Sequence, residues 1–492
     1  MEGRDLCARG TFYNGRGSPP RAAPSPRGAI LMGRTMDSVA ALAAAFAQRG
    51  RSLYLVGGCV RDALLGFSTH DLDLTTEAEP AEIKSLVSAA GADAIYTIGE
   101  RFGTIGAIFG EDQVEITTFR SESYTPGNRK PEVQYGTSLE ADLSRRDFTV
   151  NAMARPAAGG GIIDPFGGQE DLAAKLIRAV GDPDERFAED PLRLLRAVRF
   201  AAQFGFAIEP ATRAAIARNA NALRTISAER VAQELNRILL VDRPSRPIRE
   251  LCVLGLMQHI IPELLALRDV RAPGLRHKDN FEHTLMVLDR TPSVLAVRWG
   301  ALLHDIAKPR VMSVEDQEVH FYGHEAVGER IARRILQRLK YDRATIERVG
   351  LLVRLSGRIN SYEGEWTDGA VRRLVREADD ALDDLLALSR SDVTSRREER
   401  VRAAEDRVEQ LRERALRLRE EEDVARIRPP LDGLELMEMF GRGPGPWIRP
   451  IKDRLLAMVL DGELAPDDKE RAAEIARALM QEAGSPSATG SG

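Results

Sequence analysis

Two aspartates one residue apart, Asp71 and Asp73, have a spacing that suits metal-dependent chemistry. In a β-strand, residues two apart project from the same face, so both carboxylates would point to one spot. Like charges held that close need a cation, and hard oxygen ligands favour Mg²⁺. Two Mg²⁺ ions held in this way can activate an attacking hydroxyl and neutralise a leaving phosphate.

A glycine pair, Gly57-Gly58, precedes these aspartates. Glycines let backbone N–H groups approach a triphosphate with no Cβ in the way. A lone Asp-x-Asp is also common on protein surfaces, and the glycine pair is what favours the functional interpretation. Glu115 is a candidate third catalytic carboxylate, and the alternative is a solvated strand residue.

The elements expected to position these groups are short strands mixed with helices. Leu53 to Val56 reads as a buried strand that ends at the glycines, and residues 71–74 alternate polar and apolar as a half-buried strand does. Further strands are expected at 105–109 and 114–119, and helices at 81–90 and from Met36 onward. This pattern predicts an α+β head with a mixed sheet.

After Gly181 the pattern becomes helical to the end of the chain. Helices are expected at the following ranges: 187–204, 210–219, 228–240, 281–290 and 295–307. The highly charged segment 395–424 is expected to be a solvated helix or a helical hairpin.

Composition limits the function classes. A chain of 492 residues is long enough for about three domains. The net charge of −5 gives no general signal for nucleic acid, so an RNA partner would need a local basic face. The three cysteines are far apart, which disfavours disulfides and thiolate zinc sites. Neither a membrane span nor a secretory signal is expected, so the predicted location is cytoplasmic.

Six ordered segments of residues 55–235 resemble the motifs of the class II CCA-adding enzymes and bacterial poly(A) polymerases, in the polymerase-β-like nucleotidyltransferase superfamily. The first joins residues 55–62 to Asp71-Leu72-Asp73. The others are the following: RFGT at 101–104, RRDFTVNA at 145–152, DPFGG at 164–168, EDPLRLLR at 189–196, and SAER at 227–230 with Glu234-Leu235.

The resemblance implies roles for individual residues. Asp71 and Asp73 would hold the catalytic metals. The expected contacts to the incoming nucleotide fall in three groups: Gly57, Gly58 and Arg61 at the triphosphate, Arg146 and Asp147 near the sugar, and Asp190 and Arg193 at the base.

Base reading by Asp190 and Arg193 has a physical rationale. Residues three apart share a helix face, so an acceptor carboxylate and a donor guanidinium there can imitate a Watson–Crick edge. Cytosine and adenine each offer an amine donor beside a ring-nitrogen acceptor, whereas uracil and guanine place a donor where an acceptor is needed. Arg196 and Arg199 continue the stripe and are expected to clamp phosphates. The alternative is an intrahelical ladder of ion pairs.

Family members differ in product, which is whole CCA, CC, A alone or poly(A). Residues 123–131 resemble the flexible loop kept by members that switch from C to A, which favours CCA or A addition. With a sequence pI of about 6.0, the chain lacks the basic character that is frequent in the poly(A) polymerase branch of the family. CCA addition to the tRNA 3′ end from CTP and ATP is therefore the expected function, with A addition or poly(A) synthesis as alternatives.

A second set of residues resembles an HD phosphohydrolase domain, and it lies within residues 275–392. The ordered set is His283, His304-Asp305, His324 and Asp392. His and Asp together suit a divalent-metal site that activates water. Val353-Arg354-Leu355 stands where complete HD sites often carry another histidine. The alternatives are a phosphohydrolase acting on cyclic phosphates or phosphomonoesters, as main or second activity, and a purely structural domain.

The sequence predicts six regions. They are the following: a disordered extension (1–35), the nucleotidyltransferase head (36–180), a helical base-reading neck (181–260), the HD domain (261–395), a helical tRNA-binding region (396–483) and a disordered tail (484–492). The expected partners are the tRNA 3′ end, CTP and ATP, with two Mg²⁺ ions in the head and a divalent metal in the HD domain. The oligomeric state is left open.

Overall fold

The computed structural model describes most of the chain and forms two compact units. The described ranges are 26–68, 71–123, 132–136, 138–269, 279–316, 318–360, 362, 366–394, 397–422 and 428–484, with the side chains of 26–36, 121–123, 132–135, 360, 400, 420–422 and 482–484 left out. The first unit runs up to Ala266 and includes Ser293–Leu295 and Arg338–Tyr341, and the second is the remainder from Leu267. The predicted head and neck both fall in the first unit, and their boundaries stay predictions.

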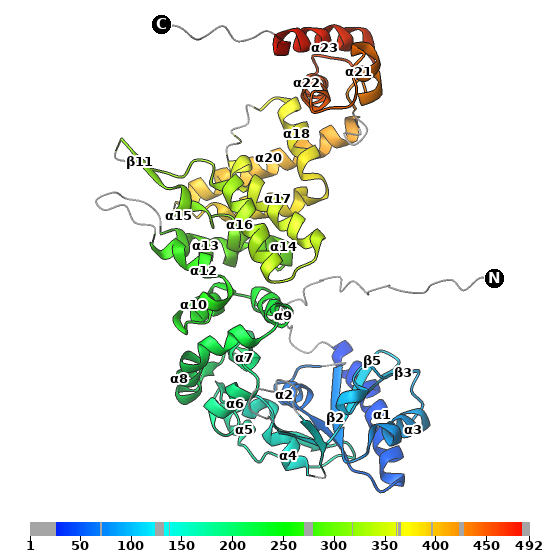
Figure 1. The fold of residues 1–492 in the computed structure, drawn as a ribbon. Coiled ribbons are helices and arrows are strands. Elements are labelled where there is room, and N and C mark those ends of the chain that lie inside the picture. Colours follow the sequence, from blue (N-terminus) through cyan, green and yellow to red (C-terminus); the bar gives the residue numbers. More distant parts are fainter. Residues whose placement is uncertain are drawn as a thin grey trace, which may run out of the picture. The chain divides into compact units, whose positions relative to one another are not determined.

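The described residues of the head form a six-stranded sheet of order β3-β4-β5-β2-β1-β8 (Figure 1). The strands are β1 (Leu53–Val56), β2 (Asp71–Thr76), β3 (Ala94–Tyr96), β4 (Thr104–Phe109), β5 (Asp112–Thr118) and β8 (Ala154–Pro156). Strands β2 and β5 are parallel, and the other pairs are antiparallel. The mixed sheet and the α+β head are confirmed.

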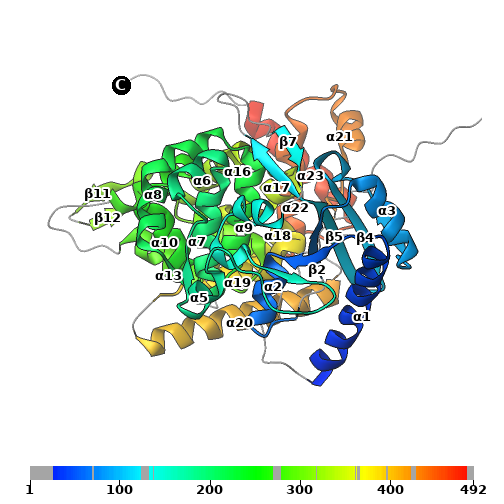
Figure 2. The same cartoon turned by 90° about the horizontal axis from the view of Figure 1, so that it is seen from below.

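One face of this sheet carries the core of the head. Helices α1 (Pro26–Gln48) and α3 (Pro80–Ala89) lie along it (Figure 2), where Leu42, Phe46 and Ile83 pack on Leu72 and Leu74. Helix α1 begins at Pro26 and not at Met36, and residues 1–25 of the expected extension lie outside the described residues. The strand pattern thus buries Leu72 and Leu74 and leaves Asp71 and Asp73 for the other face.

Short elements lie between the strands of the sheet or between the sheet and the helical neck. They are the following: α2 (Gly58–Leu64), β6 (Arg120–Ser123), β7 (Glu132–Tyr135), α4 (Leu139–Ser144), α5 (Gly168–Ala173) and β9 (Leu176–Ile177), which pairs in parallel with β10 (Ala207–Ile208). The neck helices are α6 (Pro183–Glu189), α7 (Leu192–Phe204), α8 (Pro210–Asn219), α9 (Ala228–Leu239), α10 (Ser245–Val253), α11 (Met257–Ile260) and α12 (Pro262–Leu265).

The second unit is mainly helical, as predicted. Its elements are α13 (Asn280–Arg290), α14 (Leu295–Leu303), α15 (Lys308–Val311), the hairpin β11 (Ser313–Glu315) and β12 (Glu318–His320), α16 (His324–Arg338), α17 (Arg343–Asn360), α18 (Asp368–Ala378), α19 (Leu382–Asp392), α20 (Glu398–Glu422), α21 (Gly433–Phe440), α22 (Ile448–Leu460) and α23 (Lys469–Gly484). Helices α21 to α23 share a small core around Leu436, Leu455 and Ala476.

The charged segment expected at 395–424 forms one helix, α20, so the hairpin alternative is wrong. Val408, Leu411, Ala415 and Leu418 are buried at a spacing of three and four, and they form one apolar stripe along the helix. The helix is therefore solvated on its remaining faces and packed on one.

Candidate functional site

A tight glycine turn joins β1 to α2. Gly57 has φ +72°, a left-handed conformation that favours glycine, and its N–H donates to the Met153 carbonyl at 3.2 Å. A Cβ added at Gly57 would lie 2.6 Å from Arg146 Nη1, and one at Gly58 would lie 3.4 Å from Arg61 Nη2. The missing side chain at Gly57 thus lets Arg146, expected near the sugar, approach the turn, whereas a Cβ at Gly58 would only touch Arg61.

Three carboxylates gather on the open face of the sheet. Asp71 and Asp73 are exposed and alternate with buried leucines, so they share one face of β2 as predicted. Glu115 on β5 is the register partner of Asp73 and is also exposed. The structure therefore brings the candidate third carboxylate beside the other two.

The charges of these carboxylates affect one another. Desolvation raises the pKa of Asp73, Arg146 opposes the shift, and the like charge of Asp71 adds to it. Desolvation also raises the pKa of Glu115, with Asp73 and Asp71 adding to it. An oxygen-rich site whose carboxylates repel one another is one that a hard cation would stabilise.

Arg61 is held beside the glycine turn by a buried network. Its Nε and Nη2 donate to Asp62 Oδ1 at 3.0 and 2.9 Å, and its Nη1 donates to Asn151 Oδ1. The guanidinium carbon lies 4.5 Å from the Phe204 ring centroid. Asn151, which the sequence analysis gave no role, belongs to the RRDFTVNA segment and fixes this arginine.

Asp147 connects the head to α7. Its Oδ1 accepts from the Phe148 amide at 2.9 Å and Asn151 Nδ2 at 3.0 Å, and its Oδ2 accepts from Arg196 Nε at 2.7 Å and Nη2 at 2.6 Å. Burial raises its pKa, but Arg196 and Asn151 outweigh that effect, so the pKa of Asp147 lies below its usual value. Asp147 therefore anchors Arg196 here, in addition to any contact with a sugar.

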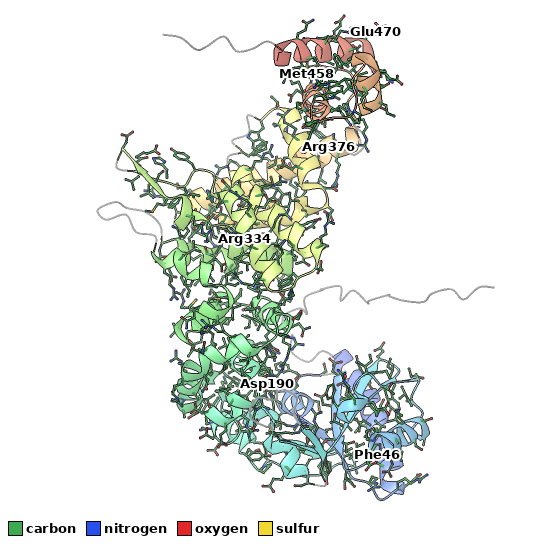
Figure 3. All side chains as sticks on the ribbon, viewed as in Figure 1. Phe46, Asp190, Arg334, Arg376, Met458 and Glu470 are labelled. Atoms are coloured by element: carbon green, nitrogen blue, oxygen red, sulfur yellow. The ribbon has the colours of Figure 1, made fainter. Side chains whose placement is uncertain are left out.

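The helix predicted over 187–204 is wrong, because the chain breaks at Asp190-Pro191. Helix α6 ends at Glu189, Asp190 is extended with φ −141° and ψ 96°, and α7 begins at Leu192. A residue before proline is disfavoured in the helical region, which explains the break. Asp190 (labelled in Figure 3) and Arg193 thus do not share one helix face as expected, although they stay near in sequence.

Asp190 and Arg193 are each held by other partners. Asp190 Oδ1 accepts from the Leu192 amide at 3.1 Å, and Oδ2 pairs with Arg230 Nη2 at 2.8 Å. Arg193 is buried and donates to the Arg186 and Arg145 carbonyls at 2.9 and 2.7 Å. It also pairs with Glu189 at 2.7 Å. Both side chains are therefore fixed before any base arrives.

Arg199 is a poor match to the expected phosphate clamp. It is buried, its Nε pairs with Glu234 Oε2 at 2.6 Å, and its Nη1 donates to Gln203 at 3.1 Å. Glu234 also pairs with Arg237 at 3.3 Å and lies 3.9 Å from Arg196. The sequence analysis placed Glu234 in a motif without a role, and only the buried contacts reveal one.

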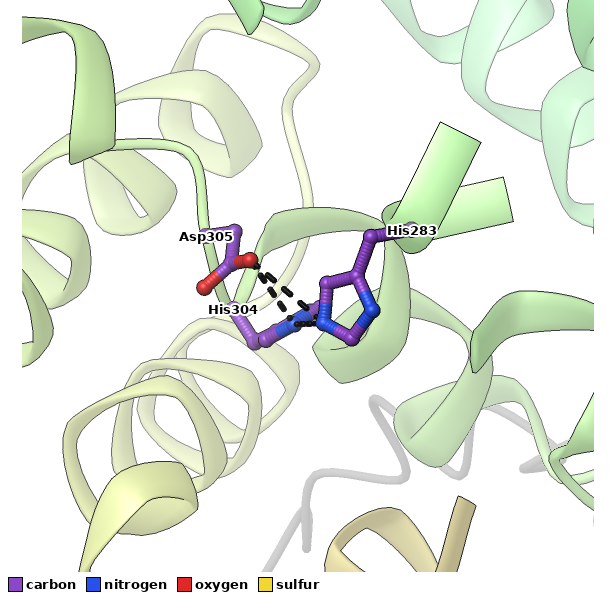
Figure 4. A group of neighbouring side chains, drawn as sticks. All are labelled: His283, His304 and Asp305. Carbon is purple, nitrogen blue, oxygen red and sulfur yellow. Dashed lines mark hydrogen bonds and ion pairs between the residues drawn. The ribbon is translucent and has the colours of Figure 1, made fainter. Parts of the chain in front are cut away.

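The second unit gathers the HD residues around one point (Figure 4). His283 Nε2 lies 3.4 Å from His304 Nε2 and 2.8 Å from Asp392 Oδ1. Asp305 Oδ2 lies 3.3 Å from His304 Nε2 and 3.7 Å from His283 Nε2. His304, expected on a helix, follows the end of α14 at Leu303. Among the described residues, His283, His304 and Asp305 offer ligand atoms close enough to share one metal ion.

His324 is at the margin of this cluster, because its Nε2 lies 3.7 Å from Asp305 Oδ1. Val353, at the expected departure from the HD pattern, lies in α17 and is fully buried.

In three of these histidines Nδ1 is held by a hydrogen-bond partner, which we call its tether, and Nε2 is the nitrogen that faces the cluster. Nδ1 of His283 lies 2.8 Å from Thr394 Oγ1. Nδ1 of His304 lies 2.8 Å from the Ala301 carbonyl, and Nδ1 of His324 lies 2.8 Å from the Phe321 carbonyl. Such tethers orient metal-binding histidines and set their tautomer.

Electrostatics in this cluster also suit a cation. Burial lowers the pKa of His304, but Asp305 and Asp392 outweigh it and raise that pKa to about 10. The pKa of Asp305 lies below its usual value, because His304 and Lys308 outweigh the effect of burial. The buried carboxylates thus draw positive charge, which a proton supplies here and a metal ion would supply equally.

Part of the predicted machinery lies outside the described residues. Within the loop at 123–131, only Ser123 is described.

No described helix is both long and apolar enough to cross a membrane.

Three segments of the chain match models of known protein families. Family models match residues 53–178 (poly A polymerase head domain), 205–267 (probable RNA and SrmB-binding site of polymerase A) and 280–396 (HD domain). The fold and the two sites define a nucleotidyltransferase of the poly(A) polymerase class with an HD domain.

Relatives show the family more closely. The CCA-adding enzyme of Geobacillus sp. (strain WCH70) is 30% identical over 86% of this chain and 92% of its own length. The A-adding tRNA nucleotidyltransferase of Deinococcus radiodurans is 32% identical over 85% and 94%. The chain therefore belongs to the family of CCA-adding enzymes and bacterial poly(A) polymerases with a fused HD domain.

Two further comparisons differ in extent. The CCA-adding enzyme of Lacticaseibacillus paracasei is 44% identical, but the match spans 52% of this chain and 60% of that enzyme. The crystal structure of the Bacillus stearothermophilus CCA-adding enzyme in complex with CTP matches with a TM-score of 0.63 at 27% identity, over 92% of this chain and 99% of that one.

Proposed function

We propose that this protein adds CCA to the 3′ end of tRNA from CTP and ATP, releasing pyrophosphate. The observation that carries the proposal is the pair of carboxylates on one face of β2, with Glu115 on the adjacent strand. The family's CCA-adding members support the product, and the cytoplasm is the compartment we expect for it.

The oxygen-only donor set of Asp71, Asp73 and Glu115 fits Mg²⁺. When bound there, two such ions supply charge neutralisation and activation of the attacking hydroxyl. The chain's own residues do the positioning. The Gly57 turn gives backbone N–H groups close access to phosphates, and Arg61 and Arg146 add positive charge beside it. The tRNA 3′-hydroxyl then attacks the α-phosphate, and pyrophosphate leaves.

Selection of C and A is proposed to depend on Asp190 and Arg193. The chain break at Pro191 lets Asp190 extend, while three hydrogen bonds hold Arg193 in place. A rigid acceptor and donor can reject U and G, because a mismatched buried polar group costs roughly 1–3 kcal/mol. Protein side chains would thereby take the place of a nucleic-acid template.

The product is tested by incubating the full chain with tRNA that ends at its discriminator base. CTP and ATP are supplied separately and together, and the 3′ ends are sequenced. Stepwise addition of C, C and A with arrest supports the proposal. A single A on tRNA that already carries CC, without C addition, indicates the A-adding alternative, and a long A tail indicates poly(A) synthesis.

A second activity is proposed for the HD cluster, because His283, His304 and Asp305 offer ligand atoms close enough to hold one divalent metal ion. Water activated there would hydrolyse 2′,3′-cyclic phosphates or phosphomonoesters. Release of phosphate from 2′,3′-cyclic AMP or p-nitrophenyl phosphate, with and without added Ni²⁺, Mn²⁺ or Mg²⁺, tests it. No turnover with any of these metals would leave the cluster with a structural role.

A further inference from the structure

The neck contains a cavity that neither proposed site uses. It has a volume of about 700 Å³ and lies where the C-terminal half of α7 meets β10, α8 and the start of α10. Its lining residues are Val198, Ala201, Ala202, Gln203, Phe204, Gly205, Phe206, Ala207, Ile208, Arg213, Asp242, Arg243, Arg246, Pro247 and Glu250. All of them belong to the first unit, and the volume is typical of a pocket for a small molecule.

Two arginines that line this cavity, Arg243 and Arg246, have no side-chain partner among the described residues. Arg213 pairs with Glu250 at 2.8 Å, which neutralises both. By contrast, no side chain in the described part of the protein pairs with or hydrogen-bonds to Arg243 or Arg246. Asp242 is the remaining charged group of the lining, so the cavity carries a net charge of +1. Paired guanidinium forks of this kind match phosphate oxygens.

An aromatic wall faces the same space. Phe204 and Phe206 both line the cavity, and their ring centroids lie 5.6 Å apart at 47°. Aromatic faces of this kind stack with nucleobases without regard to sequence. The cavity thus offers a phosphate-binding part and a base-binding part within one volume.

Two residues of the cavity lining also contact arginines that the sequence analysis expected to bind the nucleotide. Phe204 carries the Arg61 guanidinium carbon 4.5 Å from its centroid, and Gln203 accepts a hydrogen bond from Arg199 at 3.1 Å. A ligand that fills the cavity would therefore touch the same ring that supports Arg61.

We propose that this cavity is a second nucleotide-binding site, in which Arg243 and Arg246 hold a phosphate and Phe204 or Phe206 stacks on the base. The nucleotide belongs either to the bound RNA or to a free nucleotide. The RNA source rests on the proposed function, whereas the free nucleotide does not. The matched family region at residues 205–267 includes much of the lining and agrees with an RNA source.

The test uses the full chain carrying Arg243→Gln with Arg246→Gln, both at exposed positions. The matched control is Arg49→Gln with Arg155→Gln, which removes the same charge from exposed residues of the first unit outside the cavity lining. A second variant, Ala207→Trp, fills the cavity from an exposed position and leaves every charge in place.

Two measurements separate the sources. The affinity for tRNA lacking CCA is measured against salt concentration, and removal of the one phosphate contact lowers the slope of log Kd against log salt by about one. Calorimetric titration with AMP in EDTA gives the number of nucleotides bound per chain, and loss of the cavity site removes one.

A lower salt slope in the arginine variant, with tRNA binding also weakened by Ala207→Trp, assigns the site to RNA. Loss of one bound AMP in both variants assigns it to a free nucleotide. The proposal is overturned if neither quantity changes, or if the control pair shows the same change. Incorporation of CTP and ATP by the wild-type chain is measured in parallel, so failure of the proposed function is recognised separately.

Discussion

At the scale of single residues, the proposed chemistry rests on a few carboxylates and histidines whose surroundings differ sharply. Asp71 and Asp73 are both exposed and lie on one face of β2, whereas Asp147 is buried and accepts four hydrogen bonds. Identical side chains thus serve different ends according to what the fold places around them.

Replacing Asp71 by Asn should abolish most nucleotide incorporation without unfolding the protein. In the proposed mechanism the exposed side chain holds a metal ion, and losing transition-state charge stabilisation of several kcal/mol would lower kcat by about a thousandfold or more. Single-turnover incorporation of labelled ATP and CTP into tRNA measures it. Asp93→Asn, at another residue of the head, is the control and should keep full activity; comparable rates for both variants would contradict the assignment.

Replacing Thr394 by Val should weaken metal binding in the HD cluster. Thr394 Oγ1 fixes Nδ1 of His283, and loss of such an outer partner typically lowers metal affinity or activity about 10–100-fold. Titration with Mn²⁺ followed by electron paramagnetic resonance measures the affinity. Thr345→Val, on the distant start of α17, is the matched control, and equal affinities in both variants would refute a role for this tether.

At the scale of elements, α7 is the piece on which the head and neck depend. Asp147 holds it from the head through Arg196, and Glu234 holds it from α9 through Arg199. These buried ion pairs join segments that are distant in sequence, so their loss should affect stability more than local chemistry.

Replacing Glu234 by Gln should destabilise the first unit by about 3–5 kcal/mol, because Arg199 would stay buried without a compensating charge. Chemical denaturation followed by circular dichroism measures the change. Glu229→Gln, an exposed position on the same helix, should shift stability by no more than about 0.5 kcal/mol. A Glu234 variant as stable as that control would show that the pair contributes little.

The Asp147–Arg196 pair should also make stability depend on acid. The pKa of Asp147 is lower in the folded protein than in the unfolded chain, so its stabilising effect is complete above the unfolded value, near pH 4. It is lost as the pH falls through the folded pKa. Asp147→Asn should therefore be less stable at pH 7 and show a shallower loss of stability below about pH 4. Parallel curves for both proteins would exclude this contribution.

At the scale of the whole molecule, the two proposed activities lie in separate compact units. All the carboxylates and arginines of the proposed head and neck site belong to the first unit, and all the candidate HD ligands belong to the second. The two sites have no residue in common, so each chemistry can be removed without the other.

The double variant His304→Ala with Asp305→Ala should lose bound metal in the second unit and keep nucleotide incorporation by the first. Elemental analysis after metal loading and extension assays on tRNA provide the two readouts. His320→Ala, outside the cluster, controls for general effects. A fall in incorporation that matches the loss of metal would show that the first unit depends on the second.

The sequence by itself determined the polar and apolar alternation that sends Asp71 and Asp73 to one face of β2, the glycine turn before them, and the order of both sets of site residues. These are local properties, set by the period of a strand and by the conformations open to glycine. Tertiary structure decided what local pattern does not encode. The pairing of Glu234 with Arg199 and the contact of Thr394 with His283 each join segments that lie far apart in the sequence and are packed together only in the folded chain. Helical periodicity does not predict such partners, because burial and ion pairing depend on the neighbouring element and not on the residue spacing within one helix.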